Sequence, residues 1–363
     1  MFSNNNYTAT AKKDFINLFK EISEKKATCF LDISVLNAPA FDKFMLPALK
    51  EVNLTSKNPV KVKILSSDLI SLMNQVPDKA AGITSEIGEN GSFELVGDIG
   101  NQMNRNEEFL ATVFEETFQN HTYVITRNMK QACDLDVISN FESCKTHPLN
   151  IKCISATGTF LPVPDAFKGN YDYERYNTNS GLDYKTLKYT SDKNALFIAD
   201  CSFMFKEAFL RNFYPALKSI NKLKKDGMTL TIHQAILLEM EKVTIKKPWL
   251  AGIIRELRST IHKDMSKHTL FKFGSGMTTN FVDSDILSTA MRNIRNKSIV
   301  IFSLDRKLTN DLIRLNNLQS VNDIKGVYTL GFDRNNELVP FRYRNHHQFD
   351  RQTPDAEPGF YAS

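Results

Sequence analysis

The sequence is poor in cysteine, and its cysteines do not have the paired spacing of a zinc site. Only five occur in 363 residues, and none stands in a CxxC arrangement. An odd number without such spacing indicates buried, reduced thiols in a reducing compartment and argues against a zinc site. The five residues are Cys29, Cys133, Cys144, Cys153 and Cys201.

Long apolar runs are absent as well. No stretch approaches 18 consecutive apolar residues, so the sequence predicts no membrane-spanning helix. The first residues, Met1–Tyr7, include no basic region followed by an apolar stretch, which is the pattern of a secretory signal. We therefore expect a cytoplasmic protein that makes no contact with a membrane. The net charge of +5 permits a polyanionic partner but does not by itself argue for one.

The length and composition indicate an ordinary globular protein with two domains. The chain has 363 residues, of which 42% are apolar and 24% charged. Each half is long enough to bury a core of its own. We expect a first domain at residues 1–165, a linker at 166–192, a second domain at 193–345, and a disordered tail at 346–363 that is rich in Pro, Gln, His and Asp.

Each half contains the same short motif, an apolar run followed by Asp-x-Ser. In the second half an apolar run, residues 195–199, leads directly into Asp200-Cys-Ser202. In the first half Cys29-Phe-Leu runs in the same way into Asp32-Ile-Ser. A short apolar run bounded by polar residues is typical of a fully buried strand. The aspartate then lies at the carboxyl end of that strand, which is where α/β sheets bind their ligands.

The two halves repeat the same order of elements. From Asp32 to Ser71 is 39 positions (71 − 32), and from Asp200 to Glu239 is also 39 (239 − 200). Alternating strands and helices predict a mostly parallel sheet with helices on both faces in each half. In order, we expect helix 8–27, strand 29–31, helix 41–52, strand 60–65, helix 68–75, helix 107–117, strand 122–126, helix 128–136 and a strand pair at 151–163, then strand 195–199, helix 203–217, strand 230–232, helix 235–242, helix 283–294, strand 298–302, helix 305–315 and a hairpin at 326–341.

Four acids of the second half stand where this pattern places element junctions. Asp200 and Asp305 follow strands, while Glu239 and Asp283 lie on helices beside the same edge of the sheet. Carboxylates that converge in this way raise one another's pKa, and a divalent cation relieves the repulsion. A ligand set made only of oxygen favours Mg²⁺ or Mn²⁺ over zinc. Such a site suits metal-assisted hydrolysis of a phosphodiester.

The order of these motifs resembles the PIN-domain nucleases. The motifs are strand-Asp-x-Ser, a helical Glu, Asp283-x-x-Ile-Leu-x-x-Ala and strand-Ser303-x-Asp, and the resemblance covers residues 195–345 well and 28–165 more weakly. It implies an α/β fold of two tandem PIN-like domains, each a mostly parallel central sheet flanked by helices. It also implies that Asp200, Glu239, Asp283 and Asp305 form a metal-coordinating catalytic quartet. Ser202 and Ser303 then support water or phosphate.

The first half departs from that pattern. Asp32 is kept, but Glu239, Asp283 and Asp305 are matched by neutral residues, so most of the charge that would hold a metal is missing. Glu107 or Glu108 can replace one of the lost acids if the helix register shifts. We interpret this half as a degenerate copy that has a structural or substrate-holding role. Its matching positions are Asp32, Ser71, Asn106 and Asn128.

Each acid also has a structural explanation. Asp200 or Asp305 can cap the helix that follows it, and Asp283 can complement a helix dipole. Glu239 can be a solvated helix residue, although Glu241 fits that description better. His233 and His268 are expected to be hydrogen-bonded structural residues.

Basic residues near the second site are candidates for contact with a nucleic-acid backbone, with solvated helix faces as the alternative. Trp249, Phe271 and Phe273 are candidate stacking platforms. The candidate substrate-binding residues are Lys224, Lys225, Arg255 and Arg258.

The sequence therefore predicts a Mg²⁺- or Mn²⁺-dependent endoribonuclease. RNA is the expected partner, and DNA is the substrate of one alternative, a structure-specific DNA nuclease. The other alternative is a scaffold that binds RNA or protein without cleaving it. We further expect the two halves to pair within one chain, or the chain to form a homo-oligomer.

Overall fold

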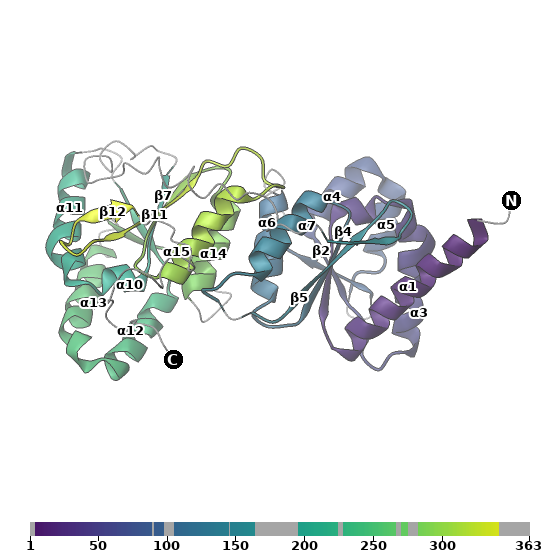
Figure 1. The fold of residues 1–363 in the computed structure, drawn as a ribbon, viewed down its shortest axis with the longest axis horizontal. Helices are drawn as coiled ribbons and strands as arrows, with labels where there is room; N and C mark the ends of the chain where they lie inside the picture. The colour runs from purple at the N-terminus through teal and green to yellow at the C-terminus, as the bar shows by residue number, and fades with distance from the viewer. Residues whose placement is uncertain are drawn as a thin grey trace, which may run out of the picture.

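The computed structural model describes residues 4–88, 91–97, 105–144, 146–163, 195–223, 228–265, 270–274 and 282–340. The expected linker at 166–192 and tail at 346–363 lie outside these residues. The chain forms two six-stranded sheets that lie side by side, one in each half (Figure 1). The predicted α/β class, with mostly parallel sheets flanked by helices, is confirmed.

The first sheet has the order β3-β2-β1-β4-β5-β6. Its first five strands are parallel, and β6 pairs with β5 in the antiparallel direction. The turn of this last hairpin contains Gly158, whose φ of +87° favours glycine. The strands are β1 (Thr28–Leu31), β2 (Val62–Leu65), β3 (Phe93–Val96), β4 (Thr122–Thr126), β5 (Leu149–Ile154) and β6 (Phe160–Leu161).

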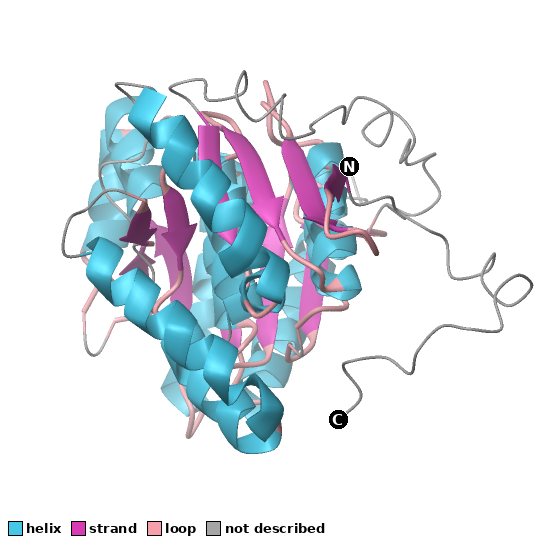
Figure 2. Ribbon diagram, turned by 90° about the vertical axis from the view of Figure 1, so that its left-hand side faces the viewer, coloured by secondary structure: helices cyan, strands magenta, loops and turns pink. Residues whose placement is uncertain are grey.

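The second sheet has the same topology, with the order β9-β8-β7-β10-β11-β12 and an antiparallel last strand. Its central strands are apolar and buried, because both faces of the sheet are covered by helices (Figure 2). The strands are β7 (Ala195–Ala199), β8 (Leu230–Ile232), β9 (Phe271–Phe273), β10 (Ser298–Phe302), β11 (Val327–Phe332) and β12 (Leu338–Pro340).

The helices of the first half follow the predicted pattern, with two additional helices, one at Ile33–Leu36 and one at Pro77–Thr84. The predicted helix at 41–52 begins with a π-helical turn, Phe41–Met45, and the region at 77–100, for which no element was predicted, also contains β3. The strand β3 escaped prediction because it has four residues at a sheet edge without alternating burial. The helices are α1 (Asn4–Glu24), α2 (Ile33–Leu36), α3 (Leu46–Thr55), α4 (Ser66–Gln75), α5 (Pro77–Thr84), α6 (Arg105–Glu116) and α7 (Met129–Ser139).

The second half differs from prediction at one helix. The expected continuous helix at 203–217 is instead a short helix, a π-helical turn at Phe209–Phe213 and a third segment, because aromatic side chains pack around Phe203. The region left as an insert, 245–280, contains α13 and β9. The helices are α10 (Cys201–Met204), α11 (Tyr214–Leu223), α12 (Ala235–Lys246), α13 (Ala251–Met265), α14 (Val282–Asn293) and α15 (Arg306–Arg314).

The two halves pack through α6 and α14, which lie against each other at the junction (Figure 1). One cluster of buried apolar side chains continues across this junction, from Phe109 and Phe114 to Ile286 and Leu287. Polar contacts surround it, and Arg292 of α14 binds both Glu108 and Glu115 of α6. The predicted pairing of the halves within one chain is thus present in the structure.

Candidate functional site

The carboxyl ends of β7 and β10 carry the first two predicted acids. These strands are neighbours at the point where the strand order reverses, which is the usual ligand site of a doubly wound sheet. Asp200 caps α10 by accepting from the amide of Ser202 at 3.3 Å. Asp305 caps α15 by accepting from the amides of Lys307 and Leu308 at 2.8 and 3.1 Å. Both residues therefore cap a helix, as the structural explanation predicted, and capping does not decide whether they also bind a metal.

Two serines hold Asp200 in place. The hydroxyl of Ser303 donates to Asp200 Oδ2 at 2.9 Å, and that of Ser202 donates to the same oxygen. The hydroxyl of Ser202 also accepts a hydrogen bond from the amide of Leu304 at 2.9 Å, and that of Ser303 accepts one from the amide of Asp305 at 3.0 Å. These bonds tie the loop after β7 to the loop after β10. Both serines thus act here as positioning residues for the carboxylate.

A thiol connects Asp200 to the third acid. Glu239 is half-buried on α12, and Cys201 Sγ lies 2.6 Å from its Oε2 and 3.1 Å from Asp200 Oδ1, so the single S–H hydrogen can be donated to either carboxylate. Sequence reasoning correctly predicted a buried, free thiol but missed that it touches two of the acids. Its position between Asp200 and Ser202 is the only sequence signal for this role.

The fourth acid, Asp283, lies in the first turn of α14. Burial raises its pKa well above the ordinary value, and the charges of Asp200, Asp305 and Glu239 raise it further. Burial likewise raises the pKa of Asp200 and of Glu239, and in each case neighbouring acids add to the effect. The four predicted residues are therefore close enough to repel one another. Neither helix capping nor the helix dipole explains why Glu239 and Asp283 share this environment.

The chemistry of these donors suits a hard divalent cation, because all four are carboxylates. Within the part of the chain that the structure describes, however, no three His, Cys, Asp or Glu side chains are gathered closely enough to chelate an ion. Four mutually repelling carboxylates thus fit Mg²⁺ or Mn²⁺ by their chemistry, but in this structure their side chains are not arranged to coordinate an ion.

The first half keeps a positioning network, the hydroxyl hydrogen bonds that hold the aspartate after the first strand, but it lacks the other three acids. Asp32 accepts from the hydroxyls of Ser34, at 2.5 Å, and Thr126, and Asn128 takes the capping role of Asp305. The side chain of Asn106 donates to Ser320 of the second half at 2.7 Å. Because a half without the quartet retains this network, the network itself has a structural role. Glu239, Asp283 and Asp305 are what distinguish the second half.

The matching place in the first half contains a small pocket with a volume of about 70 Å³. Sequence reasoning missed two of its residues, Asp68 and Arg105, which form an ion pair of 3.2 Å. The suggested replacement acid Glu108 instead binds Arg292 at 3.0 Å, and neither it nor Glu107 lines the pocket. The lining residues are Asp32, Ile33, Ser34, Asp68, Arg105, Asn106, Phe109, Asn128 and Gln131.

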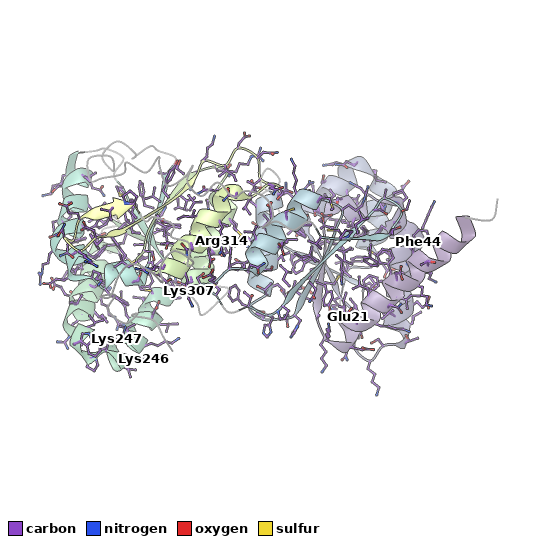
Figure 3. The ribbon with its side chains drawn as sticks, in the orientation of Figure 1. Glu21, Phe44, Lys246, Lys247, Lys307 and Arg314 are labelled. Atoms are coloured by element: carbon purple, nitrogen blue, oxygen red, sulfur yellow. The ribbon has the colours of Figure 1, made fainter. Side chains whose placement is uncertain are left out.

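The predicted substrate-binding residues are only partly within the described residues, and Lys224 and Lys225 lie outside them. Arg255 and Arg258 are exposed on α13, and Arg258 pairs with Glu241 at 3.6 Å. Trp249 is 70% exposed, next to Lys246 and Lys247 at the end of α12 (Figure 3).

One prediction about histidine is wrong. His233 follows β8 and is fully buried, yet neither ring nitrogen has a hydrogen-bond partner among the residues that the structure describes. Gly274 lies close beside the ring. His268 lies outside the described residues.

Comparisons with known proteins add little to this description. No family profile matches the chain, and no curated protein is similar to it. A glycosyl transferase family 9 structure from Veillonella parvula DSM 2008 aligns over 77% of this chain and 81% of its own, with 7% identity and a TM-score of 0.18. A likeness at that level supports no inference about function. Among the described residues, no helix has the length and apolarity needed to span a membrane.

Proposed function

We propose that the second half hydrolyses phosphodiester bonds with the help of Mg²⁺ or Mn²⁺, and that RNA is the substrate. The observation that supports this proposal is the group of four acids at the switch point of the second sheet, where burial and neighbouring acids together raise the pKa of Glu239 and of Asp283. RNA is the substrate that the resemblance to PIN-domain nucleases implies.

In this proposal Asp200 and Asp305 hold the cation, and Asp283 completes the site. Bound there, the cation supplies Lewis-acid stabilisation of the phosphate charge and a lowered pKa for water. Glu239 holds the metal or orients the attacking water. Ser202 and Ser303 keep the Asp200 carboxylate aimed at the site, and Cys201 restrains Glu239 beside it.

The deciding experiment compares cleavage of a mixed pool of structured RNA by the wild type and Asp283→Asn in Mn²⁺, Mg²⁺ or EDTA. We expect metal-dependent cleavage by the wild type and a loss of about 100-fold or more in the variant. Asp285→Asn is a matched control, because Asp285 stands in the same helical turn but is not among the groups that raise the pKa of Asp200 or of Glu239.

Hairpins of RNA and DNA tested side by side distinguish the ribonuclease from a DNA nuclease. Full cleavage by Asp283→Asn contradicts the site assignment. Binding of RNA without cleavage by either protein supports the non-catalytic scaffold instead.

A further inference from the structure

The pocket of the first half carries much less negative charge than the acidic site. At the pseudo-equivalent place the second half has four acids, whereas the pocket is lined by two acids, Asp32 and Asp68, and one arginine, Arg105. Positions 105 and 282 are 177 apart, so Arg105 stands where the second half has Val282. The formal charge of these groups changes from −4 to −1, and a guanidinium takes the place of an apolar side chain.

Arg105 forms an ion pair with a buried acid. Its Nε lies 3.2 Å from Asp68 Oδ1, without hydrogen-bond geometry, and the Asp68 side chain is 2% exposed, whereas that of Arg105 is 36% exposed. Among the described residues no hydrogen bond engages the terminal nitrogens of Arg105. These two nitrogens form a fork, which is the geometry that binds an oxyanion in a bidentate manner.

The remaining polar groups favour the same ligand. The carboxylate of Asp32 already accepts hydrogen bonds from Ser34, Thr126 and the amide of Val35, so its oxygens are engaged within the protein. Arg127 is not a lining residue, but its Nη1 donates to the carbonyl of Ser34, which is one, at 3.2 Å. Asn128 and Gln131 add side-chain amides to the lining.

We propose that this pocket binds a phosphate group, with the guanidinium of Arg105 as its main ligand. The site holds the phosphate without hydrolysing it, because no second acid is free there to act on water. Nucleotides and RNA both carry this group, and the pocket selects the group rather than a base. This proposal does not depend on cleavage by the second half.

The test is calorimetric titration of the full chain in EDTA with inorganic phosphate, with AMP, and with a short RNA that carries or lacks a 5′-phosphate. We expect phosphate and AMP to bind, and Arg105→Ala to weaken both by about 10- to 100-fold. Arg105→Lys should retain only part of the affinity, since it keeps the charge but not the fork. Arg334→Ala, in the exposed turn before β12, is the control that should change nothing.

The RNA titrations show where the bound phosphate comes from. Binding that requires the 5′-phosphate assigns the pocket to a terminal monoester, and equal binding of both RNAs assigns it to the phosphodiester chain. A double variant, Asp68→Asn with Arg105→Ala, avoids leaving a buried unpaired carboxylate and should lose affinity to the same extent.

The proposal is overturned if phosphate and AMP do not bind at about 10 mM, or if they bind equally to wild type and Arg105→Ala. Titrations in the Asp283→Asn background separate the two sites. There we expect phosphate to bind as in the wild type whether or not the second half proves to be a nuclease.

Discussion

Arg292 and Glu115 occupy the same position in the two halves, 177 residues apart, and they bind each other. The guanidinium of Arg292 donates to both oxygens of Glu115, at 2.5 and 2.8 Å, and to Glu108 at 3.0 Å. One member of a pseudo-equivalent pair is thus basic and the other acidic. In a symmetric dimer of identical chains the same position would juxtapose like charges, so this sequence difference favours pairing within one chain.

The pair should contribute measurably to the stability of the junction. We expect Arg292→Ala to lower the free energy of unfolding by about 2–3 kcal/mol, since the pair is largely buried and two carboxylates lose their partner. Urea denaturation measures this change, and a double-mutant cycle with Glu115→Ala isolates the pair. Arg211→Ala, which removes an exposed pair with Glu256, should cost less than about 1 kcal/mol. Equal losses of unfolding free energy in Arg292→Ala and Arg211→Ala would refute the proposed role of Arg292 in stabilising the junction.

A second symmetric contact gives a second prediction. Asp134 accepts the amides of Gln319 and Ser320, each at 2.7 Å, and the residue 177 positions on, Asp311, accepts those of Glu142 and Ser143 at 2.8 and 2.7 Å.

Removing either carboxylate leaves two amides without their partner, so we expect Asp134→Ala and Asp311→Ala each to cost about 2–4 kcal/mol. The exposed Asp78, in the first turn of α5, serves as the control and should cost about 1 kcal/mol or less as Asp78→Ala. Thermal or urea unfolding measures all three, and a negligible effect at both junction sites would contradict the assignment.

Ser303 should tolerate threonine but not alanine. The equivalent residue in the first half is Thr126, whose hydroxyl makes the same bonds to Asp32 and to the amide of Asn128. Ser303→Ala removes the donor to Asp200 and the acceptor for the amide of Asp305, and should cost about 1–3 kcal/mol. Ser303→Thr should stay within about 1 kcal/mol of the wild type. Melting temperatures of the two variants test this, and similar losses in both would contradict it.

His233 should make the second half sensitive to acid. Burial lowers its pKa to about 4, whereas an unfolded histidine titrates near 6.5. Below pH 6.5 the unfolded chain therefore binds more protons, and stability falls by up to about 3 kcal/mol as the pH drops from about 6.5 to about 4.

The matched variant is His233→Leu, because the first half has Leu65 at the equivalent position. It should be more stable than the wild type at neutral pH and should lose this part of the pH dependence. Urea midpoints measured between pH 4 and 8 provide the test. An unchanged pH profile in the variant would show that other groups cause the acid sensitivity.

Asp283 should destabilise the protein when no metal is bound. Its carboxylate is buried beside three other acids, so Asp283→Asn should raise the melting temperature in EDTA by about 2–5 °C. Mn²⁺ should stabilise the wild type and have a much smaller effect on the variant. A variant less stable than the wild type in EDTA would mean that Asp283 has a structural role.

The strand–aspartate phrases and the repeat were readable from sequence because they depend on local pattern. A buried central strand must be apolar throughout, so residues 195–199 and 298–302 stood out, and caps such as Asp305 mark helix starts directly. Edge strands such as β3 and β9 carry only three or four residues, too few for a period to show. The break near Phe209 follows from packing of aromatic rings that are distant in sequence.

The sequence by itself determined the fold class, the duplication and the acids at the strand ends, because each of these lies in short-range order along the chain. Only the tertiary structure decided which groups meet. It brought Arg105 to Asp68 and Cys201 to Glu239, both about 38 residues apart, and it paired Arg292 with Glu115 across the junction. Such contacts depend on how helices pack against a sheet and on each other, and no local periodicity encodes that arrangement.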